Sequence, residues 1–371
     1  MSESLDADVV VVGAGAGGIG VATLLARGGR RVVVLERADA AGAAWRRRYE
    51  RLRLHTSRRW SHVAGSRVRS SDRFVAAADY ADHVRDAAGA ARLDVRAGAT
   101  VTLIEQDGAT LVVHLADGPA LRTHDVVVAT GQNEVPVEPH LPGRSRFAGD
   151  LLHADTYRTG AQFRGRRVLV VGAGNTGSEL AQDLVEHGAA GVSVAIRAIP
   201  AIVPRSMGPF TSHGIAYALR GRLGTAVMRR ATAALGKLRG RRLQRLGLHP
   251  PSPTSQLRVP TLDHGFVAEV AAGRVHLVDA LVDLDETGAL LADGTHLPCD
   301  AVVLATGYRP GARQLLAPSL ADGLTDEQLA DPIVLGAARR VWFVGFGASP
   351  LGQLVLAREQ AEQVATGILS R

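Results

Sequence analysis

The chain has 371 residues, which is enough for two domains that each bury a core. Its formal charge is +7, and its single cysteine, Cys299, excludes an intrachain disulfide, a C-x-x-C redox pair and a cysteine-built metal site. No apolar run approaches the roughly 20 residues that span a bilayer. The N-terminus has no basic region and leads directly into an expected strand, so it is not typical of a signal peptide, and we expect a cytoplasmic protein.

Residues 9–36 have the pattern of a dinucleotide-binding site. A run of valines predicts a strand, Gly13, Gly15 and Gly18 follow with the spacing G-x-G-x-x-G, and a helix and a second strand come next. The first glycine permits a tight turn, the second lets the backbone approach a pyrophosphate, and the third lets helix and strand pack closely. Glu36 ends the second strand, where an acid binds a ribose 2′-OH and repels a 2′-phosphate. This site should therefore take FAD or NAD.

The segment FAGDLLHADTY, at residues 147–157, precedes a second glycine-rich pattern. Phe147, Gly149, His153 and Tyr157 have the spacing F-x-G-x-x-x-H-x-x-x-Y. We expect Gly149 to provide a bend and His153 and the two aromatic residues to anchor this linker. His153 then has an organising role and is not a proton-transfer base.

The second glycine-rich pattern predicts an NADPH site. Gly172, Gly174 and Gly177 repeat the spacing after an apolar strand, and the next strand ends at Arg197, where the first pattern has Glu36. An arginine in place of the acid favours a 2′-phosphate, to which it donates charge-assisted hydrogen bonds. Arg205, slightly further along, is a second candidate for this contact.

A stretch without any acidic residue runs from His187 to Leu262 and contains eleven arginines and Lys237. Apolar residues recur mostly four apart within it, which predicts amphipathic helices with a basic outer face. Three alternatives stay open: a solvated arginine face on a helical cap, an electropositive mouth for an anionic substrate, and docking on an anionic membrane surface. Membrane contact is the least favoured of the three. Nucleic acid is disfavoured because stacking aromatic residues are nearly absent.

Three further strands complete the predicted architecture. Residues 126–131 and 301–310 each contain an apolar strand that ends in Ala-Thr-Gly and can return the chain between nucleotide domains. The last strand, near residue 341, precedes a glycine turn and a helix for which Ser349 is the expected N-cap. We predict an α/β protein with two nested Rossmann-like dinucleotide-binding domains. The FAD domain comprises 1–155 and 310–371, and the NADPH domain comprises 156–309, with the basic cap at about 205–262.

With these motifs the sequence resembles the flavin-containing monooxygenases (class B flavoprotein monooxygenases), and most of all the YUCCA-type indole-3-pyruvate monooxygenases. The resemblance includes LER at 35–37, RLRLHT at 51–56, the linker motif, LATGYRP and WFVGFG. Related Baeyer–Villiger enzymes usually end the linker motif in Trp, whereas this chain has Tyr157. One departure is that family members often place an asparagine after the first domain's Trp. This chain has LHTSRRW there, so Thr56 or Ser57 would have to substitute.

The resemblance implies an enzyme that binds FAD and NADPH and uses a C4a-(hydro)peroxyflavin to transfer one atom of molecular oxygen to a small substrate. The substrate classes are amines, sulfides, ketones and 2-oxo acids, and bound NADP⁺ would shield the reactive flavin from water. No metal is expected. The organising candidates are His153, Tyr157 and Thr56. The predicted cofactor-binding residues are Gly13, Gly15, Gly18, Glu36, Arg37, Trp45, Ala129, Thr130, Gly131, Gly172, Gly174, Asn175, Thr176, Gly177, Arg197, Arg205, Thr306, Gly307, Gly347 and Gln353.

Two other functions are compatible with the same two nucleotide-binding loops. An NAD(P)H-dependent flavin oxidoreductase would pass electrons to a quinone or a protein acceptor without inserting oxygen, and the linker motif argues against it. The other is a non-catalytic flavoprotein that senses redox state or binds a partner through its basic cap, and the Arg197 site argues against it. Disulfide reductases are excluded by the single cysteine. The sequence leaves homo-oligomer formation open.

Overall fold

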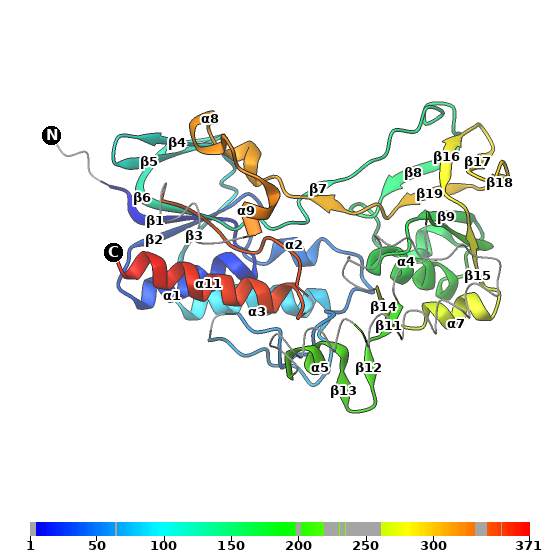
Figure 1. Cartoon of the computed structure of the whole chain (residues 1–371), viewed down its shortest axis with the longest axis horizontal. Helices are drawn as coiled ribbons and strands as arrows, with labels where there is room; N and C mark the ends of the chain where they lie inside the picture. The colour runs from blue at the N-terminus through cyan, green and yellow to red at the C-terminus, as the bar shows by residue number, and fades with distance from the viewer. Residues whose placement is uncertain are drawn as a thin grey trace. The chain divides into compact units, whose positions relative to one another are not determined.

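The computed structural model describes residues 5–63, 65–197, 202–218, 230, 234, 261–330, 340–349 and 351–371. The chain forms two compact units (Figure 1). The first comprises Met1–Arg47, Thr56–Val135 and Tyr308–Arg371, and the second comprises Arg48–His55 and Pro136–Gly307. We call the short segment Arg48–His55 the strap, because both of its ends continue into the first unit.

The first unit contains a mixed sheet in which parallel strands carry the first glycine loop. Its strands run in the order β3-β2-β1-β6-β5-β4. Strand β5 pairs with the first part of β6, at Leu121–Thr123, and β21 pairs with the last part, at Val126–Val128. The elements of this unit are β1 (Ala7–Val12), α1 (Ala16–Arg27), β2 (Val32–Glu36), α2 (Ala43–Arg46), α3 (Ala77–Ala90), β3 (Asp94–Ala97), β4 (Val101–Asp107), β5 (Thr110–Leu115), β6 (Leu121–Val128), a 3₁₀ turn (Ala312–Leu315), α8 (Pro318–Ala321), α9 (Asp326–Ala330), β21 (Val341–Phe343) and α11 (Gln353–Leu369). Strands β7 (Val135–Pro136) and β20 (Tyr308–Arg309) pair where the chain passes between the units.

Helix α11 packs along α1 on one face of this sheet (Figure 1). The expected N-cap of α11 is wrong. The helix begins at Gln353. The preceding Gly352 has a φ of +96°, which a right-handed helix does not allow, so the helix cannot start before it. Ser349 instead accepts a hydrogen bond from the N–H of Leu351 within the preceding turn.

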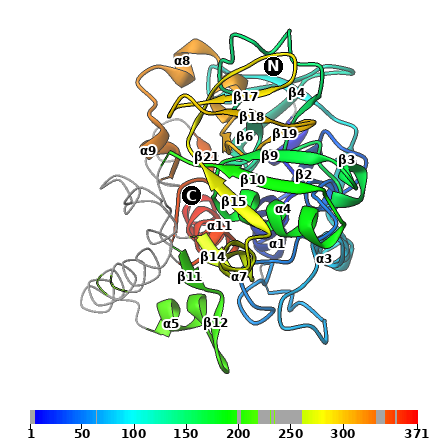
Figure 2. The same ribbon diagram turned by 90° about the vertical axis from the view of Figure 1, so that its right-hand side faces the viewer.

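The second unit is built on a five-stranded sheet in the order β15-β10-β9-β19-β8, and every pairing in it is parallel (Figure 2). Its elements are β8 (Asp150–His153), a 3₁₀ turn (Gly160–Phe163), β9 (Arg167–Val171), α4 (Asn175–Glu186), β10 (Gly191–Ala195), β11 (Ile202–Pro204), β12 (Ser206–Met207), β13 (Phe210–Thr211), α5 (Ser212–Ala218), β14 (Thr261–Asp263), α7 (Phe266–Ala271), β15 (Val275–Val278), β16 (Leu281–Leu284), β17 (Gly288–Leu291), β18 (His296–Pro298) and β19 (Ala301–Leu304).

Both faces of the second sheet are covered, as a parallel sheet requires. Helices α4 and α7 bury one face around Val168, Leu180 and Phe266. The antiparallel sheet β16-β17-β18 covers the other face, where Cys299 lies in the core as a buried free thiol. Burial raises the pKa of that thiol to about 11, so Cys299 is protonated at neutral pH and serves in packing.

The linker belongs to the second unit because it forms β8, an edge strand that pairs in parallel with β19. The units therefore divide at Val135, earlier than the boundary at 155 that we expected from the sequence. Gly149 lies at a bend before β8, and the need for glycine there is spatial. A Cβ at this position would stand 2.5 Å from the carbonyl oxygen of Asp300 and 2.5 Å from the ring of Phe147.

His153 stabilises a turn within the linker, and Tyr157 ties the linker to the rest of the second unit. The Nδ1 atom of His153 accepts a hydrogen bond from the N–H of Asp155, and burial lowers the pKa of this ring. Tyr157 is fully buried and stacks on Phe163. Its hydroxyl donates to Asp183 of α4 at 2.7 Å. These contacts support an organising role for the motif.

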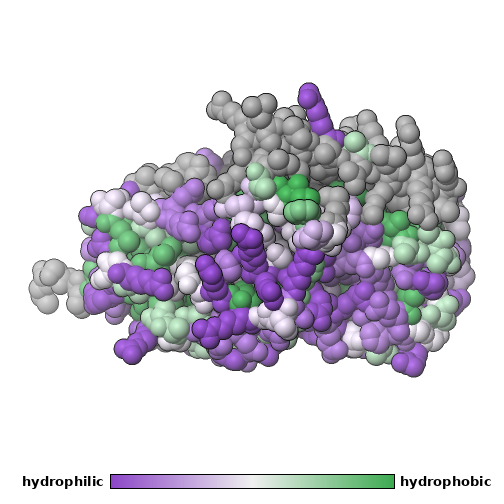
Figure 3. All heavy atoms as spheres, turned by 90° about the horizontal axis from the view of Figure 1, so that it is seen from below, coloured by the Kyte–Doolittle hydropathy of each residue, from purple (hydrophilic) through white to green (hydrophobic). Residues whose placement is uncertain are grey.

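Among the described residues, none of the helices has both the length and the hydropathy that crossing a membrane requires. On the face drawn in Figure 3, hydrophilic side chains predominate, and the hydrophobic ones form small patches. The cytoplasmic location stays a prediction from the sequence.

Tyr157→Phe tests the attachment of the linker to α4. The carboxylate of Asp183 is buried and accepts from both the Tyr157 hydroxyl and the N–H of Gly160. Removing one donor from a buried acceptor should lower the free energy of unfolding by about 1–3 kcal/mol. Chemical denaturation followed by far-UV circular dichroism measures this loss. In an Asp183→Asn background the same substitution should cost less, and an equal cost there would contradict the assigned bond.

Candidate functional site

The first glycine loop leaves room for a ligand at its middle glycine. Gly13 has a φ of +104°, and a Cβ there would stand 2.6 Å from the carbonyl oxygen of Ala129. A Cβ at Gly18 would lie 1.9 Å from the carbonyl oxygen of Gly13. At Gly15, by contrast, a Cβ would meet no atom within 4 Å. The outer glycines are thus required by the protein's own packing, whereas the middle one faces open space, as a dinucleotide-binding loop needs.

Glu36 is held beside this loop. Its carboxylate accepts hydrogen bonds from the N–H groups of Ala14, at 2.8 Å, and of Ala38, at 2.9 Å. The neighbouring Arg37 forms an ion pair with Glu134 at 3.0 Å. The two backbone donors fix the acid at the end of β2, which is the position of a ribose-binding acid in this fold.

Thr130 is an unsatisfied polar group in the same place. It follows β6 in the first Ala-Thr-Gly, its Cα lies near the loop at Gly13, and its hydroxyl is buried without a hydrogen-bond partner among the residues that the structure describes. A buried hydroxyl in that state is expected to have a ligand or a water as its partner. Trp45 of α2 packs edge-to-face on the buried Tyr80, with ring centroids 5.2 Å apart.

Thr56 and Ser57, the expected substitutes for the family's asparagine, are both buried. The hydroxyl of Thr56 lies 2.7 Å from that of Ser61, which also donates to the carbonyl oxygen of Ser57. These contacts stabilise the loop itself. They engage the hydroxyl of Thr56 within the protein, which favours a structural role for it.

The second glycine loop repeats the first. Gly172 has a φ of +106°, and its Cβ would stand 2.7 Å from the carbonyl oxygen of Ala305, in the second Ala-Thr-Gly. A Cβ at Gly177 would lie 1.9 Å from the carbonyl oxygen of Gly172, while one at Gly174 would meet no atom within 4 Å. Thr306, next to Ala305, donates from its hydroxyl to the carbonyl oxygen of Val137.

Arg197 and Arg205, both predicted to bind a 2′-phosphate, have different surroundings. Arg197 is exposed, two residues after the end of β10. Arg205 is partly buried, and its guanidinium donates to the carbonyl oxygen of Leu54 at 2.5 Å and to Nδ1 of His264 at 3.3 Å. The contacts of Arg205 are therefore made within the protein, whereas Arg197 is accessible to a ligand.

Other predicted residues lie at the ends of secondary-structure elements. Asn175 is the first residue of α4, and its side-chain oxygen accepts from the N–H of Leu262 at 2.7 Å. Gln353, the first residue of α11, donates to the carbonyl oxygen of Gly345 at 3.0 Å. Gly347 has a φ of +95°, so the turn before α11 requires a glycine there. Gly131 and Gly307, which end the two Ala-Thr-Gly segments, also have positive φ.

Sequence reasoning missed the polar face of α4. Five polar residues of this helix contact three other segments. We call these five residues the polar stripe: Asn175, Glu179, Gln182, Asp183 and Glu186. Asn175 contacts β14, and Asp183 contacts the linker. Glu179, Gln182 and Glu186 contact the strap. A spacing of three and four residues places these side chains on one face of a helix, which is a signal that the sequence contains.

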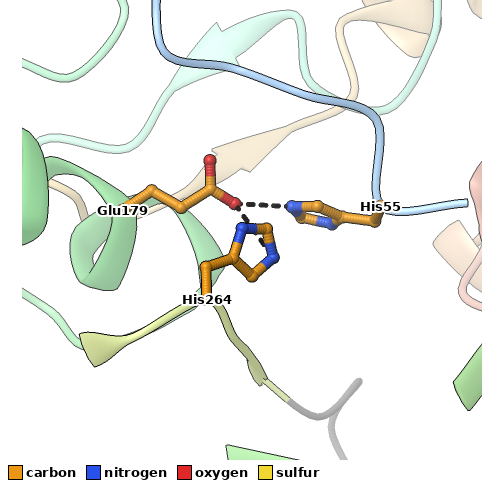
Figure 4. A group of neighbouring side chains, drawn as sticks. All are labelled: His55, Glu179 and His264. Atoms are coloured by element: carbon orange, nitrogen blue, oxygen red, sulfur yellow. Dashed lines mark hydrogen bonds and ion pairs between the residues drawn. The ribbon is translucent and has the colours of Figure 1, made fainter. Parts of the chain in front are cut away.

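Glu179 is the most buried acid of this stripe, with 2% of its surface exposed. It accepts from the Tyr49 hydroxyl at 2.9 Å and lies 2.8 Å from Nε2 of His55 (Figure 4). Burial raises its pKa, but its interactions with His55, His264 and Tyr49 outweigh burial, and the net shift is downward. Burial lowers the pKa of Arg205 to about 10 and that of His264 to about 4. At neutral pH the carboxylate and the guanidinium are therefore charged and the His264 ring is neutral.

The basic cap expected at about 205–262 lies mostly outside the described residues. Its described parts are 205–218, the positions 230 and 234, and the start of β14. The three alternatives for its arginines are accordingly unchanged.

Two family models match this chain. The model described as flavin-binding monooxygenase-like matches residues 119–321, which is more than half of the chain. A model described as pyridine nucleotide-disulphide oxidoreductase matches residues 10–207. A sequence with one cysteine cannot form the thiol pair of disulfide chemistry, so we attribute the second match to the nucleotide-binding framework.

Individual proteins agree with the first model. The indole-3-pyruvate monooxygenase YUCCA1 of Oryza sativa subsp. japonica is 36% identical over 317 residues, covering 81% of this chain and 76% of the relative. The solved flavin-containing monooxygenase from Stenotrophomonas maltophilia has a TM-score of 0.73 at 24% identity and covers 97% of this chain and 98% of its own. Cyclohexanone monooxygenase from Rhodococcus sp. Phi1, solved with NADP⁺, has a TM-score of 0.74 at 19% identity, with 98% and 84% covered.

The two solved structures show the fold, and with it they confirm the two Rossmann-like domains predicted from the sequence. The family model and the rice relative carry the assignment further. The chain belongs to the flavin-binding monooxygenase-like family and is a flavin-dependent monooxygenase of small molecules, as its motifs predicted.

Proposed function

We propose that the first unit binds FAD, that the second binds NADPH, and that the enzyme oxygenates a 2-oxo acid. The two glycine loops, which we call the first and second cradle, carry the cofactor part of this proposal. In each, the middle glycine faces open space while the outer two lie against backbone. The first cradle has Glu36 at its ribose position, and the second has Arg197 at the corresponding strand end.

The residues present fit these cofactors. The open face at Gly15, the two N–H groups that orient Glu36 and the buried Thr130 hydroxyl suit a flavin nucleotide. Gly174 and the N-terminus of α4 suit a pyrophosphate, and Arg197 suits a 2′-phosphate. When bound, NADPH supplies two electrons and the flavin supplies the chemistry that activates oxygen. The protein then has to bind, orient and exclude water.

The proposed substrate class rests on the relatives. The rice protein is named as an indole-3-pyruvate monooxygenase, and indole-3-pyruvate is a 2-oxo acid. For such a substrate the balanced reaction is R–CO–COOH + O₂ + NADPH + H⁺ → R–COOH + CO₂ + H₂O + NADP⁺. One oxygen atom enters the new carboxylic acid and the other leaves as water. The bond between the ketone carbon and the carboxyl carbon breaks.

Arg197→Ala tests the nucleotide assignment. Loss of a charge-assisted bond to the 2′-phosphate should raise the KM for NADPH about tenfold to hundredfold and should leave the KM for NADH nearly unchanged. Steady-state kinetics with both nucleotides measures the difference. Arg313→Ala, which removes an exposed arginine of the first unit, is the matched control. An equal rise for the two nucleotides would refute the assignment of Arg197 to the 2′-phosphate.

Turnover under ¹⁸O₂ tests the reaction. With indole-3-pyruvate or phenylpyruvate, we expect the shortened acid to gain one ¹⁸O atom, with one CO₂ released per NADPH oxidised. Mass spectrometry and NADPH absorbance measure both. Consumption of NADPH with stoichiometric hydrogen peroxide and no labelled product, for amines, sulfides, ketones and 2-oxo acids alike, would favour the electron-transferring oxidoreductase.

A further inference from the structure

Four segments of the second unit bring neighbouring polar groups together around Glu179. Glu179 lies 2.8 Å from Nε2 of His55 and 3.8 Å from Nε2 of His264 (Figure 4). His264 accepts from Arg205, and Arg205 donates to the carbonyl oxygen of Leu54, the residue before His55. We call these five residues the ring. It joins the strap, α4, and the residues that follow β11 and β14.

The ring lies next to the second glycine loop through the two-stranded ribbon of β11 and β14. These strands pair in parallel, with Pro204 opposite Asp263, so Arg205 and His264 follow at the same end. Within β14, the N–H of Leu262 donates to Asn175, and the hydroxyl of Thr261 donates to the carbonyl oxygen of Ala173. Asn175 and Ala173 belong to the loop, so a displacement of the ribbon moves the loop with it.

A metal centre is the other arrangement that these side chains suggest, because ligand atoms of His55, Glu179 and His264 lie within 4.8 Å of one another. The guanidinium of Arg205 argues against it. Arginine can only donate, so Nδ1 of His264 accepts and its ring proton sits on Nε2, the nitrogen that would have to bind the metal. A charged guanidinium beside the site also repels a cation.

We propose that Glu179 is a positioning residue for the nicotinamide nucleotide. Through the ring it holds the ribbon against the second glycine loop, and it makes no contact with the 2′-phosphate. The inference rests on the proposed NADPH site. The carboxylate accepts from the buried hydroxyl of Tyr49 and from the partly buried ring of His55, and it supplies the negative charge on α4 that acts on Arg205. Without that charge, the partly buried guanidinium of Arg205 loses the negative charge on α4 that offsets its burial, and Tyr49 and His55 donate to a weaker, neutral acceptor. The ribbon then loses its anchor.

Glu179→Gln tests this inference, because glutamine keeps the shape and removes the charge. In flavin-loaded protein we expect the dissociation constants of NADP⁺ and NAD⁺ to rise by the same factor, about tenfold, so that their ratio stays constant. The KM for NADPH should rise while kcat at saturating NADPH stays within about twofold, as expected for lost binding that is uniform along the reaction. Isothermal titration with each nucleotide and steady-state kinetics measure these values.

Two variants serve as controls. Glu186→Gln removes a charge from the same helix at a residue outside the ring, and should leave both constants unchanged. His264→Gln breaks the ring at another member and should reproduce the equal rise, which keeps the test valid if Glu179→Gln does not fold.

The outcomes separate the inference from the proposed function. A wild-type protein that binds no NADP⁺ would refute the proposed nucleotide site. Unchanged or tighter nucleotide binding in Glu179→Gln and His264→Gln would overturn the positioning role alone. A rise confined to NADP⁺ would also overturn it, since Glu179 would then act on the 2′-phosphate. Stoichiometric Zn²⁺ binding that is lost in both variants would replace the ring by a metal centre.

Discussion

Both nucleotide cradles depend on one steric constraint, the passage of a glycine loop across the end of the neighbouring strand. At Gly13 and Gly172 the loop backbone lies so close to Ala129 and Ala305 that a Cβ would overlap their carbonyl oxygens. Each alanine begins an Ala-Thr-Gly segment. The paired motifs therefore describe one packing solution used twice: a strand ends, its last carbonyls meet the loop, and the middle glycine is left facing open space.

Helix α4 connects the second cradle to the rest of its unit. Its N-terminus forms the end of the glycine loop, while its polar stripe binds the linker through Asp183 and the strap through Glu179. Charged groups this buried are stable only when their partners are in place. The linker motif and the strap thus have the same structural role: each supplies hydrogen-bond donors to carboxylates of α4.

Much of this could be predicted from the sequence because it depends on local patterns. Valine runs and glycine spacing fix β1, β9 and both loops, since their requirements are steric and act over a few residues. What could not be predicted depends on pairing between distant segments. The linker's membership in the second sheet requires β19, whose residues lie 151 positions further along the chain. Arg205 donates to the carbonyl oxygen of Leu54, and Glu179 becomes buried, only when the strap folds back on α4. The prediction that Ser349 caps α11 was wrong because the helix begins later, after Gly352.

The most direct test of the account is a matched pair of substitutions, Gly15→Ala and Gly174→Ala. At both positions φ is negative and a methyl group would meet no protein atom within 4 Å, so both variants should fold normally. Flavin content by absorbance and NADP⁺ affinity by titration are then measured on each. We predict that Gly15→Ala loses FAD and that Gly174→Ala keeps FAD but binds NADP⁺ at least tenfold more weakly. Equal effects on both cofactors, or no effect on either, would contradict the assignment of one dinucleotide to each cradle.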